Sequence, residues 1–88
     1  MSFEVVLSRT ARRALTETLP HAVAASAWEF IDGPLHENPR RVGKPLAGQL
    51  AGRWSARRGT SRILSSIDGG RLTVLVLDVR RRADAHRT

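Results

Sequence analysis

The stretch that decides the fold is RWSARRGTSRILSSIDGGRLTVLVLDV, from Arg53 to Val79. Three runs in it, 53–58, 61–67 and 72–79, have the alternation and the β-branched or apolar content typical of strands. Gly59 ends the first run, and Asp68-Gly69-Gly70 between the second and the third is typical of a tight hairpin turn. We therefore predict three consecutive antiparallel strands.

Alternation along a strand places successive side chains on opposite faces of the sheet. In the first run Trp54 and Ala56 lie on one face, and the residues that alternate with them lie on the other. In the second run Ile63 lies on the face opposite to Arg62. A bulge near Gly59 would shift this register. The predicted outer set is Arg53, Ser55, Arg57, Arg62 and Leu64, and the predicted inner set is Trp54, Ala56, Ser61, Ile63 and Ser65.

The third run is apolar on both faces, as expected of a central strand that is covered at least partly on both sides. Strict alternation places Leu72, Val74 and Val76 on one face and Leu75, Leu77 and Val79 on the other.

The segment before this stretch indicates one further strand and two helices. A strand is predicted from Phe3 to Leu7. A first helix follows, with Ser8 or alternatively Thr10 as its N-cap, and Pro20 ends it. The second helix is predicted from His21 to Asp32, and Gly33-Pro34 is predicted to stop it. Residues 35–52 are rich in glycine and proline and indicate a loop, which Val42, Leu46 and Leu50 are placed to pin to the core.

The predicted order is therefore β-α-α-β-β-β: an N-terminal strand, a helical hairpin and a three-stranded antiparallel segment. This order is typical of an α+β fold with two helices on one face of a mainly antiparallel sheet. At 88 residues, the chain 1–88 is predicted to form a single domain.

Composition narrows the function classes. The chain has no cysteine, which excludes disulfides, thiolate chemistry and cysteine zinc sites. Met1-Ser2-Phe3-Glu4 lacks a secretory signal pattern, and the longest apolar run, 72–77, is too short to cross a bilayer. We expect a soluble, cytoplasmic protein without a membrane partner, and neither metal nor cofactor is indicated.

Positive charge is concentrated in one half of the chain. The net charge is +7; residues 1–37 carry three arginines against five acids, a net of −2, and residues 38–88 carry twelve cations against three acids, a net of +9. Fourteen of the fifteen cations are arginine, whose planar fork suits phosphate. GC-rich coding would also favour arginine over lysine, but it does not explain the segregation. Nucleic acid is the favoured partner, ahead of an acidic protein segment and an anionic membrane surface.

Arginines from several strands are predicted to meet at one end of the sheet. The last strand delivers Arg80, Arg81 and Arg82 to its end, and a run of this kind alone is typically a solvated surface. Together with Arg53, Arg57 and Arg62 from neighbouring strands, it favours a phosphate-binding concavity. Arginine stabilises the phosphorane formed when a ribose 2′-hydroxyl attacks its phosphodiester, but it is a poor general base.

A base near neutrality must then be a histidine or a carboxylate. The chain has three histidines, and His86 lies in the tail between Arg82 and Arg87. Neighbouring cations favour the neutral imidazole, which suits a base. An unstructured terminal histidine is the alternative.

Two motifs resemble a known toxin family. Asn38-Pro39-Arg40-Arg41-Val42-Gly43-Lys44-Pro45-Leu46, followed by Leu50-Ala51-Gly52-Arg53-Trp54-Ser55-Ala56-Arg57-Arg58-Gly59, is similar to the RelE/ParE superfamily, and closest to its actinobacterial RelE-like branch. The resemblance continues through 62–64, 67–68 and 82–84, so it covers nearly the whole chain. It implies a helical hairpin against a twisted antiparallel sheet, in agreement with the order derived above.

The resemblance also implies a function and partners. RelE-like members cut mRNA in the ribosomal A site by 2′-hydroxyl attack, without metal or cofactor, whereas ParE-like members poison DNA gyrase. Both are toxins of type II toxin-antitoxin systems, and an acidic antitoxin wraps them. By position, Arg62 matches the arginine on the scissile phosphate, Arg82 the one that stabilises the transition state, and His86 the proton-transfer residue. RNA contacts are expected from Lys44, Arg53, Arg57, Arg58, Arg80 and Arg81.

Three positions depart from the family pattern. Ser61 and Ser65 stand where relatives usually carry tyrosine, and Ser55 stands where some carry a catalytic lysine; the chain has no tyrosine at all. If the missing tyrosines stack bases, their loss costs about 1–3 kcal/mol per base. A tyrosine inside the sheet would also fill volume that serine cannot. Three functions remain open: a ribosome-dependent mRNA endonuclease, a gyrase inhibitor, and a weakened toxin that mainly binds its antitoxin.

Overall fold

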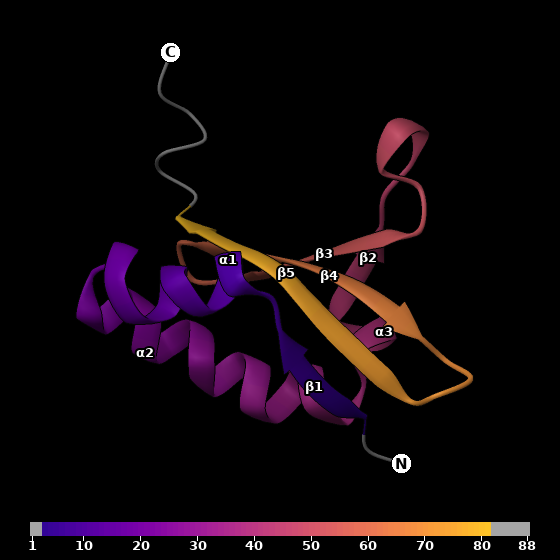
Figure 1. Cartoon of the computed structure of the whole chain (residues 1–88), viewed down its shortest axis with the longest axis horizontal. Helices are drawn as coiled ribbons and strands as arrows, with labels where there is room; N and C mark the ends of the chain where they lie inside the picture. The colour runs from indigo at the N-terminus through magenta and orange to yellow at the C-terminus, as the bar shows by residue number, and fades with distance from the viewer. Residues whose placement is uncertain (1–2, 82–88) are drawn as a thin grey trace.

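The computed structural model describes residues 3–81. The helical elements are α1 (Arg9–Arg13), η1 (Ala14–Thr18), α2 (His21–Phe30), η2 (Ile31–Leu35), α3 (Pro39–Val42) and η3 (Gly48–Leu50). The strands are β1 (Glu4–Leu7), β2 (Gly43–Pro45), β3 (Arg53–Arg58), β4 (Ser61–Asp68) and β5 (Thr73–Arg81). A five-stranded sheet carries α1 and α2 on one side (Figure 1).

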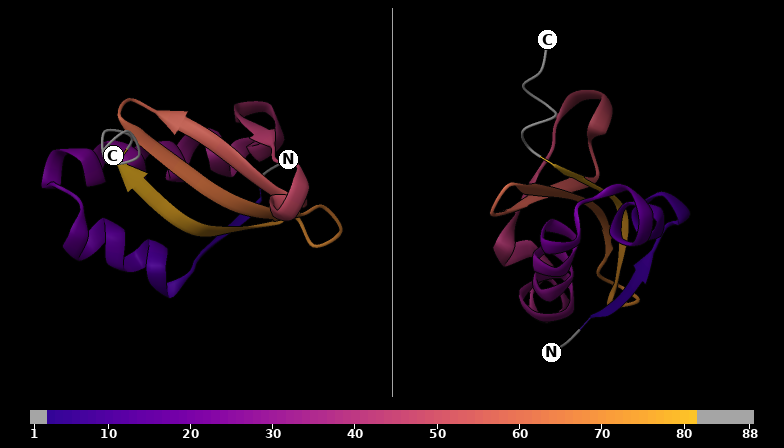
Figure 2. Two further views of the ribbon diagram at one scale, coloured as in Figure 1. Left: turned by 90° about the horizontal axis from the view of Figure 1, so that it is seen from above. Right: turned by 90° about the vertical axis from the view of Figure 1, so that its left-hand side faces the viewer.

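The sheet has the order β1-β5-β4-β3-β2 and is mainly antiparallel. Only the outer pair β1 and β5 is parallel, and the helical hairpin and the strands β2 to β4 lie between these two strands in the chain. Viewed from above in Figure 2, the strands lie in front and α2 runs behind them. The predicted α+β class is confirmed, as are β3 and, within one residue, the bounds of β1 and β4.

The first helix begins as predicted. The Ser8 side chain accepts a hydrogen bond from the Ala11 amide at 3.0 Å, which satisfies one of the free donors of the first helical turn. The helix then widens into the π-helical turn η1 and ends before Pro20, the N-cap of α2.

The prediction that Gly33-Pro34 stops the second helix is wrong. The helix continues through these residues as the π-helical turn η2, and the Asn38 amide still donates to the Pro34 carbonyl oxygen at 3.0 Å. Ile31 and Leu35 are fully buried against the sheet. Their burial stabilises the continued helix, and the wider turn accommodates a residue that lacks an amide proton.

The segment 35–52 is more ordered than predicted. Its strand β2 pairs with β3 in the register Gly43↔Ala56, Lys44↔Ser55 and Pro45↔Trp54. A three-residue strand shows no alternation, and proline is tolerated there because β2 is an edge strand. Val42 packs against the core as expected, whereas Leu50 is 43% exposed and does not pin the segment to it.

The core lies between the sheet and the helices, and one irregularity in β5 shapes it. Leu64 pairs with Asp78 but Ser65 pairs with Val76, so Leu77 is an extra residue in β5. This bulge reverses the alternation after it and brings Val79 to the helical face with Val74 and Val76. The prediction of Val79 on the opposite face is therefore wrong. The core residues are Ala11, Ala14, Ala27, Phe30, Ile31, Leu35, Ala56, Ile63, Val76 and Val79.

No helix within residues 3–81 has the length and apolar content that crossing a membrane requires.

Candidate nucleic-acid interface

Strand pairing places five cations on the face of the sheet that is turned away from the helices. Residues directly opposite one another in paired strands point to the same side. One row across the sheet is Lys44, Ser55, Leu64 and Asp78, and the next is Arg57, Arg62 and Arg80. Arg53 lies beyond the first row, two residues before Ser55. We call this surface, made by Lys44, Arg53, Arg57, Arg62 and Arg80, the basic face.

The second row consists entirely of arginine. Arg57 lies opposite Arg62, and Arg62 lies opposite Arg80, on three neighbouring strands. Adjacent strands are about 4.8 Å apart, so three guanidinium groups start from closely spaced positions. All three residues are exposed. Like charges placed directly opposite in a sheet are destabilising, so this row is expected to favour an anion that lies across it.

A hollow of about 410 Å³ lies beside the arginine row. Its basic wall comes from Arg53, Arg62, Arg80 and Arg81, and its floor includes Ser55 and Leu64. Leu46 and Leu50 form an apolar wall. Figure 1 shows the segment that carries these leucines, between β2 and β3, rising from the sheet away from α2. The hollow therefore combines cations for phosphates with apolar side chains that a nucleobase or ribose can contact.

Two of the predicted RNA-binding arginines start from the other face. Arg58 and Arg81 both lie opposite Ser61, whose side chain is buried beneath the helices. Arg81 sits at the end of β5 and borders both the hollow of the basic face and a second cleft beside Thr10, Arg13 and Leu19. The strand ends thus extend the positive surface around the edge of the sheet.

The expected stacking role for side chains at 61 and 65 is wrong. Ser61 and Ser65 are 1% and 2% exposed and point toward the helices, on the face opposite to Arg62. A tyrosine at either position would enter the core layer and could not stack a base on the basic face. The absence of tyrosine there bears on packing and not on contact with RNA at this surface.

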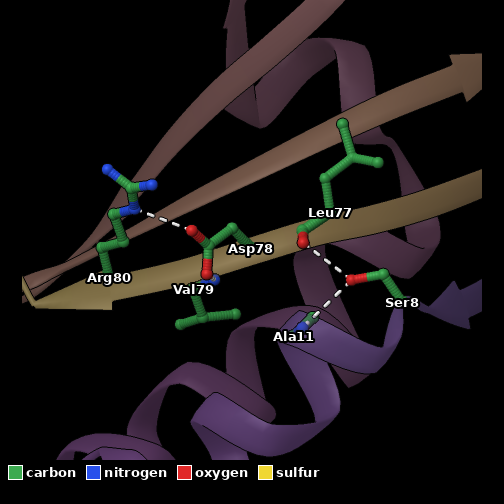
Figure 3. Close-up of polar contacts among 6 residues, drawn as sticks. All are labelled: Ser8, Ala11, Leu77, Asp78, Val79 and Arg80. Atoms are coloured by element: carbon green, nitrogen blue, oxygen red, sulfur yellow. Dashed lines mark hydrogen bonds and ion pairs between the residues drawn. The ribbon is translucent and has the colours of Figure 1, made fainter.

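Asp78 is the acid within the basic face, and sequence reasoning did not select it. Its side chain is 16% exposed and borders the hollow. Oδ2 accepts a hydrogen bond from Arg80 Nε at 2.7 Å, and Oδ1 accepts one from the Val79 amide at 2.8 Å. Figure 3 shows Arg80 extending away from α1, while Val79 points toward it. The only signal in the sequence was a single acid within an otherwise apolar strand.

The residues matched to transition-state and proton-transfer roles, Arg82 and His86, lie outside the described residues. The matched phosphate-binding residue, Arg62, lies at the centre of the arginine row. Within residues 3–81, no three His, Asp or Glu side chains group as a metal site would require. The described part of the interface can therefore bind and orient a phosphodiester, with Arg62 between Arg57 and Arg80.

Comparison with known proteins gave close relatives, although no family model matches the chain. The chain is 48% identical over 87 residues to Toxin RelG of Mycobacterium tuberculosis, covering 99% of both proteins. It is 42% identical over 85 residues to Toxin RelE of the same organism, covering 97% of this chain and 87% of that protein. The toxin-antitoxin complex RelBE2 of M. tuberculosis superimposes with a TM-score of 0.88 at 46% identity, over 93% of this chain and 100% of its own matched chain. These relatives are toxins of RelBE systems, and with this identity along almost its whole length the chain belongs to the RelE/ParE superfamily of toxins.

Proposed function

We propose that this protein is the toxin of a type II toxin-antitoxin system and acts as a ribosome-dependent mRNA endonuclease. The observation that carries the proposal is the row Arg57, Arg62 and Arg80, bordered by a hollow with Arg53 on its wall. A row of this kind suits a polyanion with regularly spaced charges. Because the basic face is open, it can accept RNA that is already held in an extended form on a ribosome.

In this proposal Arg62 binds the scissile phosphate, and Arg82 stabilises the charge that develops during attack by the ribose 2′-hydroxyl. His86 transfers the proton, because arginine remains charged and cannot serve as base. Lys44, Arg53, Arg57, Arg58, Arg80 and Arg81 hold the RNA backbone. The reaction needs no metal, since the nucleophile belongs to the substrate and arginine supplies the positive charge.

The proposed partner is a cognate antitoxin with an acidic segment, which would pair with the basic face and hold the toxin inactive in the cytoplasm. The solved relative from M. tuberculosis is a toxin-antitoxin complex, which supports such a partner. Charge supports such a partner as well. Most cations of this chain lie in its second half, and five of them, Lys44, Arg53, Arg57, Arg62 and Arg80, form the basic face.

One observation favours a weakened nuclease as the second candidate. Ser55, at a position where some relatives carry a catalytic lysine, lines the hollow beside Arg53. A hydroxyl there supplies no positive charge for a developing phosphorane. A toxin of this type would bind ribosomes and antitoxin but cut slowly.

The test is a cell-free translation reaction with added protein, in which mRNA ends are mapped while gyrase supercoiling is assayed in parallel. Cuts at ribosome-bound codons support the nuclease. Blocked supercoiling with intact mRNA would show that the protein is a gyrase inhibitor and not a nuclease. If mRNA stays intact, supercoiling is normal and the antitoxin binds tightly, the second candidate, a weakened toxin, is supported.

A further inference from the structure

Asp78 has a place in the basic face that the proposed reaction does not use. It lies next to the arginine row, opposite Leu64, and its side chain is largely sheltered from solvent. A sheltered carboxylate is normally paired or hydrogen-bonded, because removing its charge from water is costly. Both of its oxygens have such partners.

The two partners of Asp78 differ in kind. Oδ1 accepts from the backbone amide of Val79 at 2.8 Å, which fixes the carboxylate relative to β5. Oδ2 accepts from Arg80 Nε at 2.7 Å, so the fixed carboxylate in turn holds the guanidinium (Figure 3). A short bond between two charged groups is stronger than one between neutral groups. The Arg80 side chain is 77% exposed and has little packing to hold it otherwise.

This pairing also decides which donors of Arg80 remain available. A guanidinium has five N–H donors, one on Nε and four on the two Nη atoms. Since Asp78 occupies Nε, Arg80 presents its Nη pair to a ligand. Arg62 lies opposite Arg80 on β4, and the negative charge of Asp78 offsets the repulsion between these two arginines.

We propose that Asp78 is a positioning residue that holds Arg80 ready to bind a phosphate of RNA through its Nη atoms. The inference rests on the proposed RNA-binding role of the basic face. Holding the side chain in advance lowers the entropy lost when RNA binds. The opposite expectation follows from charge alone, because an acid within a basic face repels RNA and its removal should tighten binding.

The two expectations differ in sign, and Asp78→Asn separates them. Affinity for a short single-stranded oligouridine is measured across a salt series for the parent, Asp78→Asn, Arg80→Lys and the double variant. Arg80→Lys keeps the positive charge but loses the planar fork, and it leaves the sheltered carboxylate in place. Asp68→Asn is the matched control, since Asp68 also accepts from backbone amides and lies 3.9 Å from an arginine, but at the β4–β5 turn.

Asp78→Asn and Arg80→Lys should each weaken RNA binding about three- to tenfold. For Asp78→Asn this loss is expected although the variant has a more positive net charge than the parent. The double variant should bind no more weakly than Arg80→Lys, because both substitutions break one unit. Asp68→Asn should bind as the parent does or slightly more tightly. Melting temperatures of all variants confirm that the folded proteins are compared.

Equal or tighter binding by Asp78→Asn would overturn the proposal, and so would parental affinity in Arg80→Lys. Should Asp78→Asn fail to fold, Arg80→Lys decides by itself. Arg62→Ala distinguishes a failure of the Asp78 proposal from a failure of the proposed RNA-binding function. If Arg62→Ala weakens binding while Asp78→Asn does not, the basic face binds RNA and Asp78 does not position Arg80. If Arg62→Ala leaves the affinity and its salt dependence unchanged, the basic face is not the RNA interface.

Discussion

The hydroxyl of Ser8 donates a hydrogen bond to the carbonyl oxygen of Leu77 at 2.7 Å, and these residues are 69 positions apart in the chain. The same oxygen of Ser8 accepts from the Ala11 amide (Figure 3), and the Ser8 amide donates to the Val76 carbonyl oxygen at 2.9 Å. Ser8 thus joins the first turn of α1 to the bulge of β5. The bulge sets the face on which Asp78 and Arg80 lie, so the start of α1 supports the geometry of the basic face.

Ser8→Ala should lower the free energy of unfolding by about 1–2 kcal/mol, because it removes the helix cap and the bond to the bulge. It should also weaken RNA binding at temperatures where the protein is fully folded, since β5 loses a tether beside Arg80. Thr16→Ala is the control, as the Thr16 hydroxyl donates to the Arg12 carbonyl oxygen on an exposed part of the helix. Denaturant unfolding and oligouridine titration check both effects. Equal losses of stability for both variants would contradict a special role of Ser8.

Arg62→Gln should stabilise the free protein and weaken RNA binding. The substitution removes two like-charge pairs, with Arg57 and with Arg80, each expected to cost about 0.2–1 kcal/mol. The salt dependence of binding should fall by about 0.7 in the log–log slope, the value for one phosphate contact with a single strand. Arg71→Gln, a change of the same charge at the exposed β4–β5 turn, is the control. Thermal unfolding and titration at several salt concentrations provide the measurements, and an unchanged slope would place the RNA elsewhere.

Ser61→Tyr should destabilise the fold and not increase RNA binding. Ser61 is 1% exposed beneath the helices, and a larger side chain in a packed core costs about 1–3 kcal/mol. Ser61→Ala should be neutral or stabilising, because the buried Ser61 Oγ has no hydrogen-bond partner among the described residues. Unfolding experiments on both variants test this. Tighter RNA binding by the tyrosine variant would show that position 61 can reach the basic face.

A cognate acidic antitoxin, co-expressed with this protein, should raise its melting temperature. A partner that binds only the folded state stabilises it by mass action, about 2.7 kcal/mol at a concentration one hundred times Kd. The affinity should decrease with salt, but less steeply than RNA affinity does, because apolar contacts contribute to a protein interface. Calorimetry of the toxin alone and of the complex provides the measurement. A partner that binds without changing the melting temperature would contradict the expectation that the antitoxin binds only the folded state.

His86→Ala and Arg82→Ala should each reduce mRNA cleavage far more than ribosome binding. In the proposed reaction both residues act in the transition state, and a general acid or base contributes about 100- to 10,000-fold. His21→Ala is the control, since His21 is an exposed residue at the start of α2. Single-turnover cleavage of ribosome-bound mRNA and sedimentation of the protein with ribosomes separate rate from binding. Cleavage that survives the loss of His86 would remove this residue from the mechanism.

The sequence by itself determined β1, β3 and β4, the start of the first helix and most of the outer surface. Alternation in 53–58 and 61–67 assigned Arg53, Arg57 and Arg62 to one face and Ala56 and Ile63 to the core, and both assignments are confirmed. These features are local, because the side-chain period of a strand is two whatever its partner is. The cap at Ser8 was predictable for the same reason, since it depends on residues within a single helical turn.

Only the tertiary structure decided how those elements combine. The bulge at Leu77 brings Val79 into the core and places the Asp78–Arg80 pair on the basic face, although alternation alone predicted a different face for Val79. The edge strand β2 likewise forms because it pairs with β3. The helix continues through Pro34 because this buries Ile31 and Leu35. The bulge, the edge strand and the continued helix have the same physical reason. Pairing register and burial are decided by groups far apart in the chain, and their free energies exceed the local preferences that a sequence pattern records.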